Sequence, residues 1–228
     1  MVLIMRKSLL LSSLFLMASA AHAGITIGGT RVVYPESKKE SSIQVSNPDN
    51  IDYLVQSWVE NENNSREKAP FLITPPLFRL DGKQDNVLRV IRTGGNLPED
   101  RESLFWLNIK SIPSSTRQDN INTLQIAIKT RIKLLYRPAS ITGKPEEVAA
   151  QLQWREQGNQ LIVNNPTPFY MNFQEVSVGG KKLEKISYAI PEGESHFTLP
   201  ANTTSKTVSW KIINDYGGIT KAWTAQAR

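Results

Sequence analysis

The sequence contains no cysteine and only two histidines. Without cysteine the chain forms no disulfide, so its fold must depend on a hydrophobic core. His22 lies in a segment that we interpret below as removed, which leaves His196 alone. A zinc-type site would then lack ligands, and a serine hydrolase triad would have to be built on His196. We therefore expect no metal, no cofactor and no catalytic residue, and predict that the protein is not an enzyme.

The chain also lacks a long apolar run after its first residues. Near the N-terminus, Arg6 and Lys7 precede the apolar run Leu9–Ala18, and Ala21–Ala23 then supply small residues for cleavage. The run is too short to span a bilayer. We predict a cleaved signal peptide over residues 1–23, export to the periplasm and no membrane anchor; a buried first helix is the alternative.

A large excess of charge of one sign is missing as well. Without Arg6 and Lys7, 25 basic and 21 acidic side chains remain, a net charge of +4. Nucleic-acid binding calls for a clustered basic stripe with interleaved aromatic residues. The sequence has no such stripe, and we expect no nucleic-acid partner for an exported chain.

What the sequence does contain is a series of short segments with period-two alternation, separated by turn residues. This spacing predicts an all-β protein built from β-sandwiches. The pattern breaks at residues 142–145 and restarts, which predicts two immunoglobulin-like domains, at residues 24–144 and 145–228, with a cleft between them. Trp58 is expected to be buried on the third strand. The clearest strands are expected at residues 43–47, 53–59, 87–91, 161–164, 170–178 and 208–213.

The most informative segment is Leu124–Pro138, for which we predict a long strand over residues 123–137. The apolar positions are Leu124, Ile126, Ile128, Ile132 and Leu134, and the polar positions between them are Gln125, Lys129, Arg131 and Lys133. At the edge of a sheet, such a strand offers backbone groups and apolar side chains to another chain. The alternative is an ordinary sandwich strand with one face in the core and one in solvent.

The same segment resembles the last strand of the first domain in periplasmic pilus (fimbrial) chaperones. Gly29–Pro35, Pro98–Trp106 and Ile213–Gly218 resemble the same family in the same order, and the resemblance runs from about Ile25 to the C-terminus. It implies a periplasmic chaperone that binds fimbrial (pilin) subunits by donor-strand complementation and delivers them to an outer-membrane usher. The alternative is a secreted immunoglobulin-like structural or adhesin module of a fimbria.

The resemblance also implies how a subunit is held. Arg31 and Lys133 match two cations that bind the C-terminal carboxylate of a subunit in the cleft, an arrangement that gives charge-assisted hydrogen bonds. Leu124, Ile126 and Ile128 would fill the groove of the subunit, and strand addition of this kind is an established mode of recognition. Lys133 is out of phase with this row on a two-residue period. One ligand would therefore reach both only if the strand twists or bulges between them.

Two further sets of residues follow from the resemblance. A charge network between the domains is expected from Glu102, Arg137 and Asp215. An apolar patch that faces the usher is expected from Leu54, Pro76 and Ile112. Residues 74–76 match the place of a cis proline in the family. An exposed apolar strand also allows a second copy of the chain to cap it, so a self-capped oligomer is a further expectation.

Overall fold

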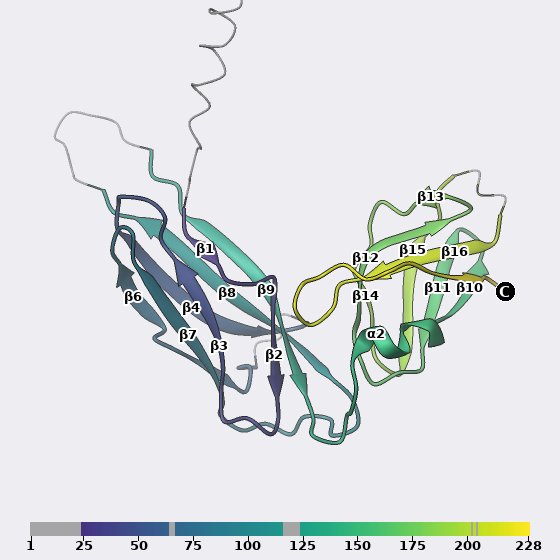
Figure 1. Cartoon of the computed structure of the whole chain (residues 1–228), viewed down its shortest axis with the longest axis horizontal. Helices are drawn as coiled ribbons and strands as arrows, with labels where there is room; N and C mark the ends of the chain where they lie inside the picture. The colour runs from purple at the N-terminus through teal and green to yellow at the C-terminus, as the bar shows by residue number, and fades with distance from the viewer. Residues whose placement is uncertain (1–23, 64–66, 116–123, 202, 204) are drawn as a thin grey trace, which may run out of the picture.

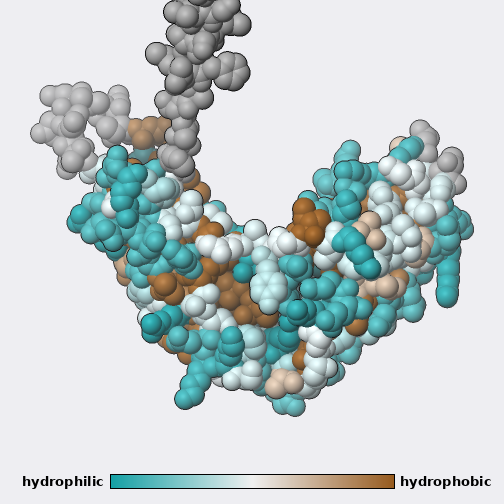
Figure 2. All heavy atoms as spheres, in the orientation of Figure 1, coloured by the Kyte–Doolittle hydropathy of each residue, from teal (hydrophilic) through white to brown (hydrophobic). Residues whose placement is uncertain are grey.

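The computed structural model describes residues 24–63, 67–115, 124–201, 203 and 205–228, which form two β-rich arms joined at a bend (Figure 1). The predicted signal peptide lies outside the described residues. In the space-filling view a hollow separates the arms, and hydrophobic residues gather on the face of the N-terminal arm (Figure 2). The prediction of an all-β protein with two sandwich domains is confirmed.

The N-terminal domain consists of two sheets, with strand orders β1-β3-β7-β5 and β2-β9-β8-β4-β6. The strands are β1 (Thr26–Ile27), β2 (Arg31–Pro35), β3 (Ser41–Ser46), β4 (Tyr53–Asn61), β5 (Phe71–Thr74), β6 (Leu77–Leu80), β7 (Asp85–Arg92), β8 (Ser103–Pro113) and β9 (Ile128–Arg137). Alternate residues of each strand point into the space between the sheets. In β4, for example, Tyr53 and Val55 are buried, whereas Leu54 and Gln56 are exposed on the outer face.

The expectation that Trp58 is buried in the core is wrong. The inward positions of β4 are the odd-numbered ones, so Trp58 shares the outer face with Leu54 and Gln56. Its side chain is half-buried there, and its indole Nε1 donates a hydrogen bond to Glu60 Oε1 at 2.8 Å. Trp58 therefore belongs to the outer surface of this sheet and not to the core.

The C-terminal domain begins with the short helix α2 (Pro145–Val148) and the 3-10 turn η1 (Ala149–Gln151). Its strands are β10 (Gln153–Gln157), β11 (Gln160–Asn165), β12 (Met171–Val178), β13 (Lys181–Lys182), β14 (Tyr188–Ala189), β15 (Gly193–Thr198), β16 (Thr207–Ile212) and β17 (Trp223–Gln226). The sheet β10-β11-β15 faces the sheet β13-β12-β16-β17, to which β14 adds through β12. Trp154, Phe173 and Trp210 pack against one another in the core between them.

The predicted domain boundary at residue 144 remains a prediction. One core cluster draws its buried residues from Val32 to Tyr136, and the other from Ala149 to Ala227. Ile141 already packs against the second core. By packing, the chain therefore changes domain a few residues before 144. Within the described ranges, no helix is both long and apolar enough to cross a membrane.

The predicted strand over residues 123–137 begins too early. β9 starts at Ile128, while Leu124–Ala127 is described without regular structure and residue 123 lies outside the described part. The antiparallel ladder with β8 runs from Ser103↔Tyr136 to Ser111↔Ile128, and β8 ends at Pro113. A strand needs partners for its backbone groups. The apolar alternation extends N-terminal to Ile128, the first residue of this segment that pairs with a described strand.

Candidate functional site

One edge of β9 is partly open. On one side β9 pairs with β8 from Ile128 to Tyr136, and on the other it pairs in parallel with β2, from Arg31↔Lys133 to Pro35↔Arg137. No described strand pairs with Ile128–Ile132 on the β2 side. An unpaired edge is a template for strand addition. The open part of this edge ends where β2 begins, at Arg31 and Lys133.

The predicted apolar row lies at the start of this edge and is exposed. Leu124 is 88% exposed, Ile126 64% and Ile128 45%. Ile132 and Leu134 continue the same alternation, but both are buried in the core of the N-terminal domain. The same apolar alternation therefore runs through two environments. Its first part, Leu124 to Ile128, is exposed, and its second part, Ile132 and Leu134, is buried inside the sandwich.

The register of β9 shows on which face of the strand Lys133 lies relative to the apolar row. The pairing with β8 is continuous from Tyr136 to Ile128 and contains no bulge. Because successive side chains alternate between faces, Ile128 and Lys133 lie on opposite faces of β9. Ile128 shares its face with the core residue Ile132, and Lys133 points toward the C-terminal domain.

Arg31 is positioned by the C-terminal domain. Its Nη1 donates a hydrogen bond to the carbonyl oxygen of Ile213 at 3.0 Å. Its Nε is buried and has no hydrogen-bond partner in the described part of the chain. Burial lowers the pKa of Arg31, and the nearby Asp215 carboxylate opposes this shift. The guanidinium thus has unused hydrogen-bonding capacity at the end of the open edge.

Lys133 is held in a similar way. Its Nζ donates to Asn172 Oδ1 at 2.6 Å and lies 4.8 Å from the ring centroid of Tyr188. Burial, together with the charge of Arg31, lowers the pKa of Lys133 to about 8. No carboxylate of the described residues lies within ion-pair distance of Lys133 or Arg31. Within the described chain the two cations therefore lie side by side without an ion-pair partner, although the Asp215 carboxylate acts on Arg31 from a greater distance. Such a pair is a suitable receptor for one carboxylate.

The structure brings Glu102, Arg137 and Asp215 together at the bend. Arg137 Nε donates to Glu102 Oε1 at 2.8 Å, and its Nη1 and Nη2 donate to the two oxygens of Asp215 at 2.7 and 2.9 Å. Glu102 Oε2 accepts from the backbone N–H of Tyr170 at 2.8 Å. Residues of both domains are therefore joined through one guanidinium.

This cluster is deeply buried. Burial raises the pKa of Glu102 to about 6, although Arg137 and the Tyr170 N–H oppose the shift. Burial alone would lower the pKa of Arg137, but the two carboxylates outweigh it and raise that pKa. Arg137 therefore remains a cation, and losing it would leave two carboxylates without their partner.

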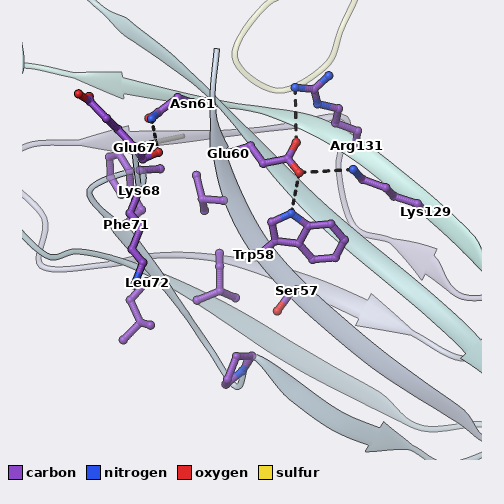
Figure 3. Close-up of a pocket in the computed structure, with 14 residues that line it drawn as sticks. Ser57, Trp58, Glu60, Asn61, Glu67, Lys68, Phe71, Leu72, Lys129 and Arg131 are labelled. Carbon is purple, nitrogen blue, oxygen red and sulfur yellow. Dashed lines mark hydrogen bonds and ion pairs between the residues drawn. The ribbon is translucent and has the colours of Figure 1, made fainter. Parts of the chain in front are cut away.

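A prominent hollow of the N-terminal domain does not coincide with the Arg31–Lys133 pair. It has a volume of about 680 Å³ and lies beside the second half of β4 and the edge of β5. Figure 3 shows Glu60 at its border, between Trp58, Lys129 and Arg131. The distances from Glu60 are 3.5 Å to Lys129 Nζ and 3.6 Å to Arg131 Nη2. These two cations share the carboxylate of Glu60 as an ion-pair partner, whereas Lys133 has none among the described residues.

The residues predicted to face the usher lie on the outer face of the N-terminal domain. Leu54 is exposed and pairs in register with Ile112 across β4 and β8. Pro76 is exposed, and its carbonyl oxygen accepts a hydrogen bond from the N–H of Ser57. The preceding Thr74–Pro75 peptide bond is cis, as expected. Sequence reasoning missed Leu77, which is 54% exposed and lies opposite Gln56 on the same face.

Sequence reasoning also missed the contribution of the C-terminal domain to the cleft. Asn172 and Tyr188 contact Lys133, and the hydroxyls of Tyr170 and Tyr188 both donate to the carboxylate of Glu62, at 3.1 and 2.7 Å. No local pattern marks these residues, because their partners are far away in the sequence. Among the described residues, no group of three or more His, Cys, Asp or Glu could hold a metal ion.

Comparisons with known proteins agree with this architecture. Residues 24–142 match the family model for the pili and flagellar-assembly chaperone, PapD N-terminal domain, and residues 147–224 match that for the pili assembly chaperone PapD, C-terminal domain. The chaperone protein FimC of Escherichia coli K12 is 43% identical over 212 residues, which cover 92% of this chain and 87% of FimC.

Two solved structures extend the similarity to three dimensions. The complex of the SafA pilin with the SafB chaperone of Salmonella enterica contains a chain that is 39% identical, with a TM-score of 0.84, and the match covers 91% of this chain and 98% of that one. The periplasmic chaperone SfaE is 40% identical, with a TM-score of 0.76, and the match covers 90% of this chain and all of SfaE.

The chain belongs to the PapD-type pilus-assembly chaperones. The resemblance inferred from the sequence is thus confirmed, as is the chaperone role, and the alternative of a structural or adhesin module is not favoured. Chaperones of this family work in the periplasm and are not a class of enzymes.

Proposed function

We propose that this protein captures pilin-type subunits by adding its β9 edge to their incomplete fold, with Arg31 and Lys133 holding the C-terminal carboxylate of the subunit. The observation that carries the proposal is the position of these two cations. They lie where β2 begins and the open edge of β9 therefore ends. A guest strand that pairs with Ile128–Ile132 would lie in line with β2, and its end would meet both cations.

The direction of the guest strand follows from this position. If its C-terminus is the end that meets Arg31 and Lys133, the guest runs from Ile128 toward Lys133 and is parallel to β9. β2, which continues the same edge, is also parallel to β9. The guest strand would therefore run in the same direction as β2, which already pairs with this edge of β9.

The apolar row then serves another part of the same guest. Leu124 and Ile126 lie just before Ile128, and they would share its face if the strand extended to them. That face is opposite to the one that carries Lys133. The row would enter the guest's own core while the cations bind its chain end, and this division of roles requires no bulge in β9.

Delivery to an outer-membrane usher is a further part of the proposal. The exposed Leu54 and Leu77, with Pro76 and Ile112, give the N-terminal domain an apolar surface away from the open edge of β9. A surface of this kind, left free when a subunit is bound, is suited to a second partner. Arg137 with Glu102 and Asp215 would keep the two arms at the angle that forms the cleft.

We further propose that residues 1–23 direct export and are removed before Gly24, so that the protein acts in the periplasm, and that it acts by binding without catalysing a reaction. Without a subunit, a second copy of the chain would cover the row Leu124, Ile126 and Ile128. N-terminal sequencing of periplasmic material should begin at Gly24.

The proposal is tested by isolating the protein from periplasm and identifying what it carries. Wild type should co-purify with a subunit whose immunoglobulin-like fold lacks its last strand. Lys133→Ala should lose this partner. Lys129→Ala is the matched control, because Lys129 lies on the same face of the same strand but already has Glu60 as an ion-pair partner. Equal loss with both variants, or retention with Lys133→Ala, would contradict a localised carboxylate anchor.

A further inference from the structure

Both cations at the end of the open edge are held by acceptors from the C-terminal domain. Arg31 Nη1 donates to the carbonyl oxygen of Ile213, and Lys133 Nζ donates to the side-chain oxygen of Asn172. The two acceptors belong to one hydrogen-bonded unit, since the Ile213 N–H donates to the backbone carbonyl of Asn172 at 2.7 Å. Asn172 is buried, and its side-chain amide also donates to the Tyr170 carbonyl at 3.3 Å.

These acceptors share a chemical property, which is that both are uncharged. An amide or carbonyl oxygen can fix the direction of an ammonium or guanidinium group, but it does not neutralise its charge. A carboxylate at the same position would do both, and it would occupy the cation as an ion pair. The Arg137 cluster illustrates the difference, because there the guanidinium forms ion pairs with the carboxylates of Glu102 and Asp215.

We propose that Asn172 is a positioning residue of the carboxylate anchor: together with the Ile213 carbonyl, it aims the paired cations into the cleft while keeping their charge available, so that the C-terminal domain sets the preference for a free carboxylate over a neutral chain end. This inference rests on the proposed function, and it adds a residue of the second domain to a site otherwise built from β2 and β9. The groups that face Lys133 are Arg31 from β2, Asn172 from β12 and Tyr188 from β14.

The sharpest test is Asn172→Asp, which changes one atom type and supplies a permanent competitor for the incoming carboxylate. The probe is a synthetic strand peptide of alternating apolar and polar residues, prepared with a free C-terminal carboxylate and as the C-terminal amide. With the mature full-length protein, we expect wild type to prefer the carboxylate form by about tenfold or more. Asn172→Asp should abolish most of this preference, because it weakens binding of the carboxylate form more than binding of the amide form.

A second readout does not depend on the peptide. The pKa of Lys133, measured by NMR of its side-chain amine, should rise in Asn172→Asp because an ion pair favours the charged form. Asn159→Asp is the matched control, since Asn159 is exposed in the turn between β10 and β11 of the same domain. It should change neither the preference nor the pKa. In a Lys133→Ala background, Asn172→Asp should have little further effect on the preference, as expected for coupled residues.

Asn172→Ser keeps the inference testable if the aspartate variant does not fold. Serine is neutral and shorter, so it should hold the ammonium less firmly. The preference for the free carboxylate over the amide form should then fall by a few fold. An unchanged preference in a folded Asn172→Asp, with an unchanged Lys133 pKa, would overturn the inference. If wild type itself does not distinguish the two peptides, the proposed function falls, and this result is separate from the first.

Discussion

At the scale of single residues, the decisive feature is Lys133, which has no ion-pair partner among the described residues. Lys133 is surrounded by Asn172, Tyr188 and Arg31, and its pKa is lowered to about 8. The partly buried charge of Lys133 lowers the stability of the free protein, and binding of a carboxylate beside it would stabilise the complex. The receptor therefore exists before its ligand, at a cost to stability.

Binding of a free carboxylate should weaken as the pH rises through about 8. Below that pH, Lys133 carries its proton and both cations contact the carboxylate; above it, only Arg31 remains charged. Calorimetric titration of the carboxylate and amide peptides from about pH 6.5 to about pH 9.5, on both sides of the Lys133 pKa of about 8, would measure this. Because a bound carboxylate favours the ammonium, binding above pH 8 should take up a proton. An equal pH dependence for the amide peptide would contradict the assignment to Lys133.

Lys133→Met should stabilise the free protein while it removes carboxylate recognition. The folded protein releases the lysine proton at a lower pH than the unfolded chain, so at neutral pH this residue opposes folding, and the opposition fades as the pH rises above about 8. Replacing an unneutralised, partly buried cation by an apolar side chain of similar length should add roughly 1–3 kcal/mol to the free energy of unfolding. Urea unfolding at pH 7 checks the sign, and a loss of stability would show that the Asn172 and Tyr188 contacts outweigh burial.

At the scale of elements, β9 performs two tasks with one alternation. Its inner part fills the core through Ile132 and Leu134, and its outer part, with the preceding Leu124–Ala127, is exposed and without a partner on the β2 side within the described chain. Which task a residue serves depends on where β8 and β2 end. The same side-chain type therefore has different consequences at positions six residues apart.

Ile126→Asp and Ile132→Asp should separate the two tasks. Ile126 is 64% exposed, so an aspartate there should change the free energy of unfolding by less than about 0.5 kcal/mol but should abolish subunit capture. Ile132 is 7% exposed in the core, and a carboxylate there should cost several kcal/mol because it would be buried without a partner. Circular dichroism with urea, and co-purification of the subunit, would measure the two effects. Unfolding of free Ile126→Asp would mean that this residue belongs to the protein's own core.

At the scale of the whole molecule, the bend is held by two sets of polar contacts between the domains. Arg137 joins Glu102 and Asp215, and Glu62 accepts from Tyr170 and Tyr188. Leu104, Leu135 and Tyr170 add a small apolar cluster between the domains. The two arms are thus tied by polar and apolar contacts at once.

Arg137→Ala should be far more damaging than Glu102→Gln. Removing the guanidinium leaves two buried carboxylates unpaired and should cost about 3–5 kcal/mol, whereas glutamine keeps an acceptor for Arg137 and should change the free energy of unfolding by no more than about 1 kcal/mol. Glu102 itself opposes folding above pH 6, since its pKa is raised to about 6 in the folded protein, and this opposition is absent at low pH. Calorimetric unfolding and small-angle scattering would report stability and the angle between the arms. Equal effects of the two substitutions would argue against a shared guanidinium.

The sequence by itself determined the all-β class, the family and the alternation of the segment Leu124–Pro138, because period-two patterning and turn residues are local properties of the chain. It also brought Arg31 and Lys133 to notice, but only through resemblance. Tertiary structure decided what each alternating residue does: Trp58 lies outside the core, β9 begins at Ile128, and Asn172 holds Lys133. These outcomes depend on pairing between distant segments, such as Arg31 with Ile213, which are 182 residues apart. Such pairing forms only when the sheets and domains pack together. A local sequence pattern does not specify where a neighbouring strand ends or which residue lies across a cleft.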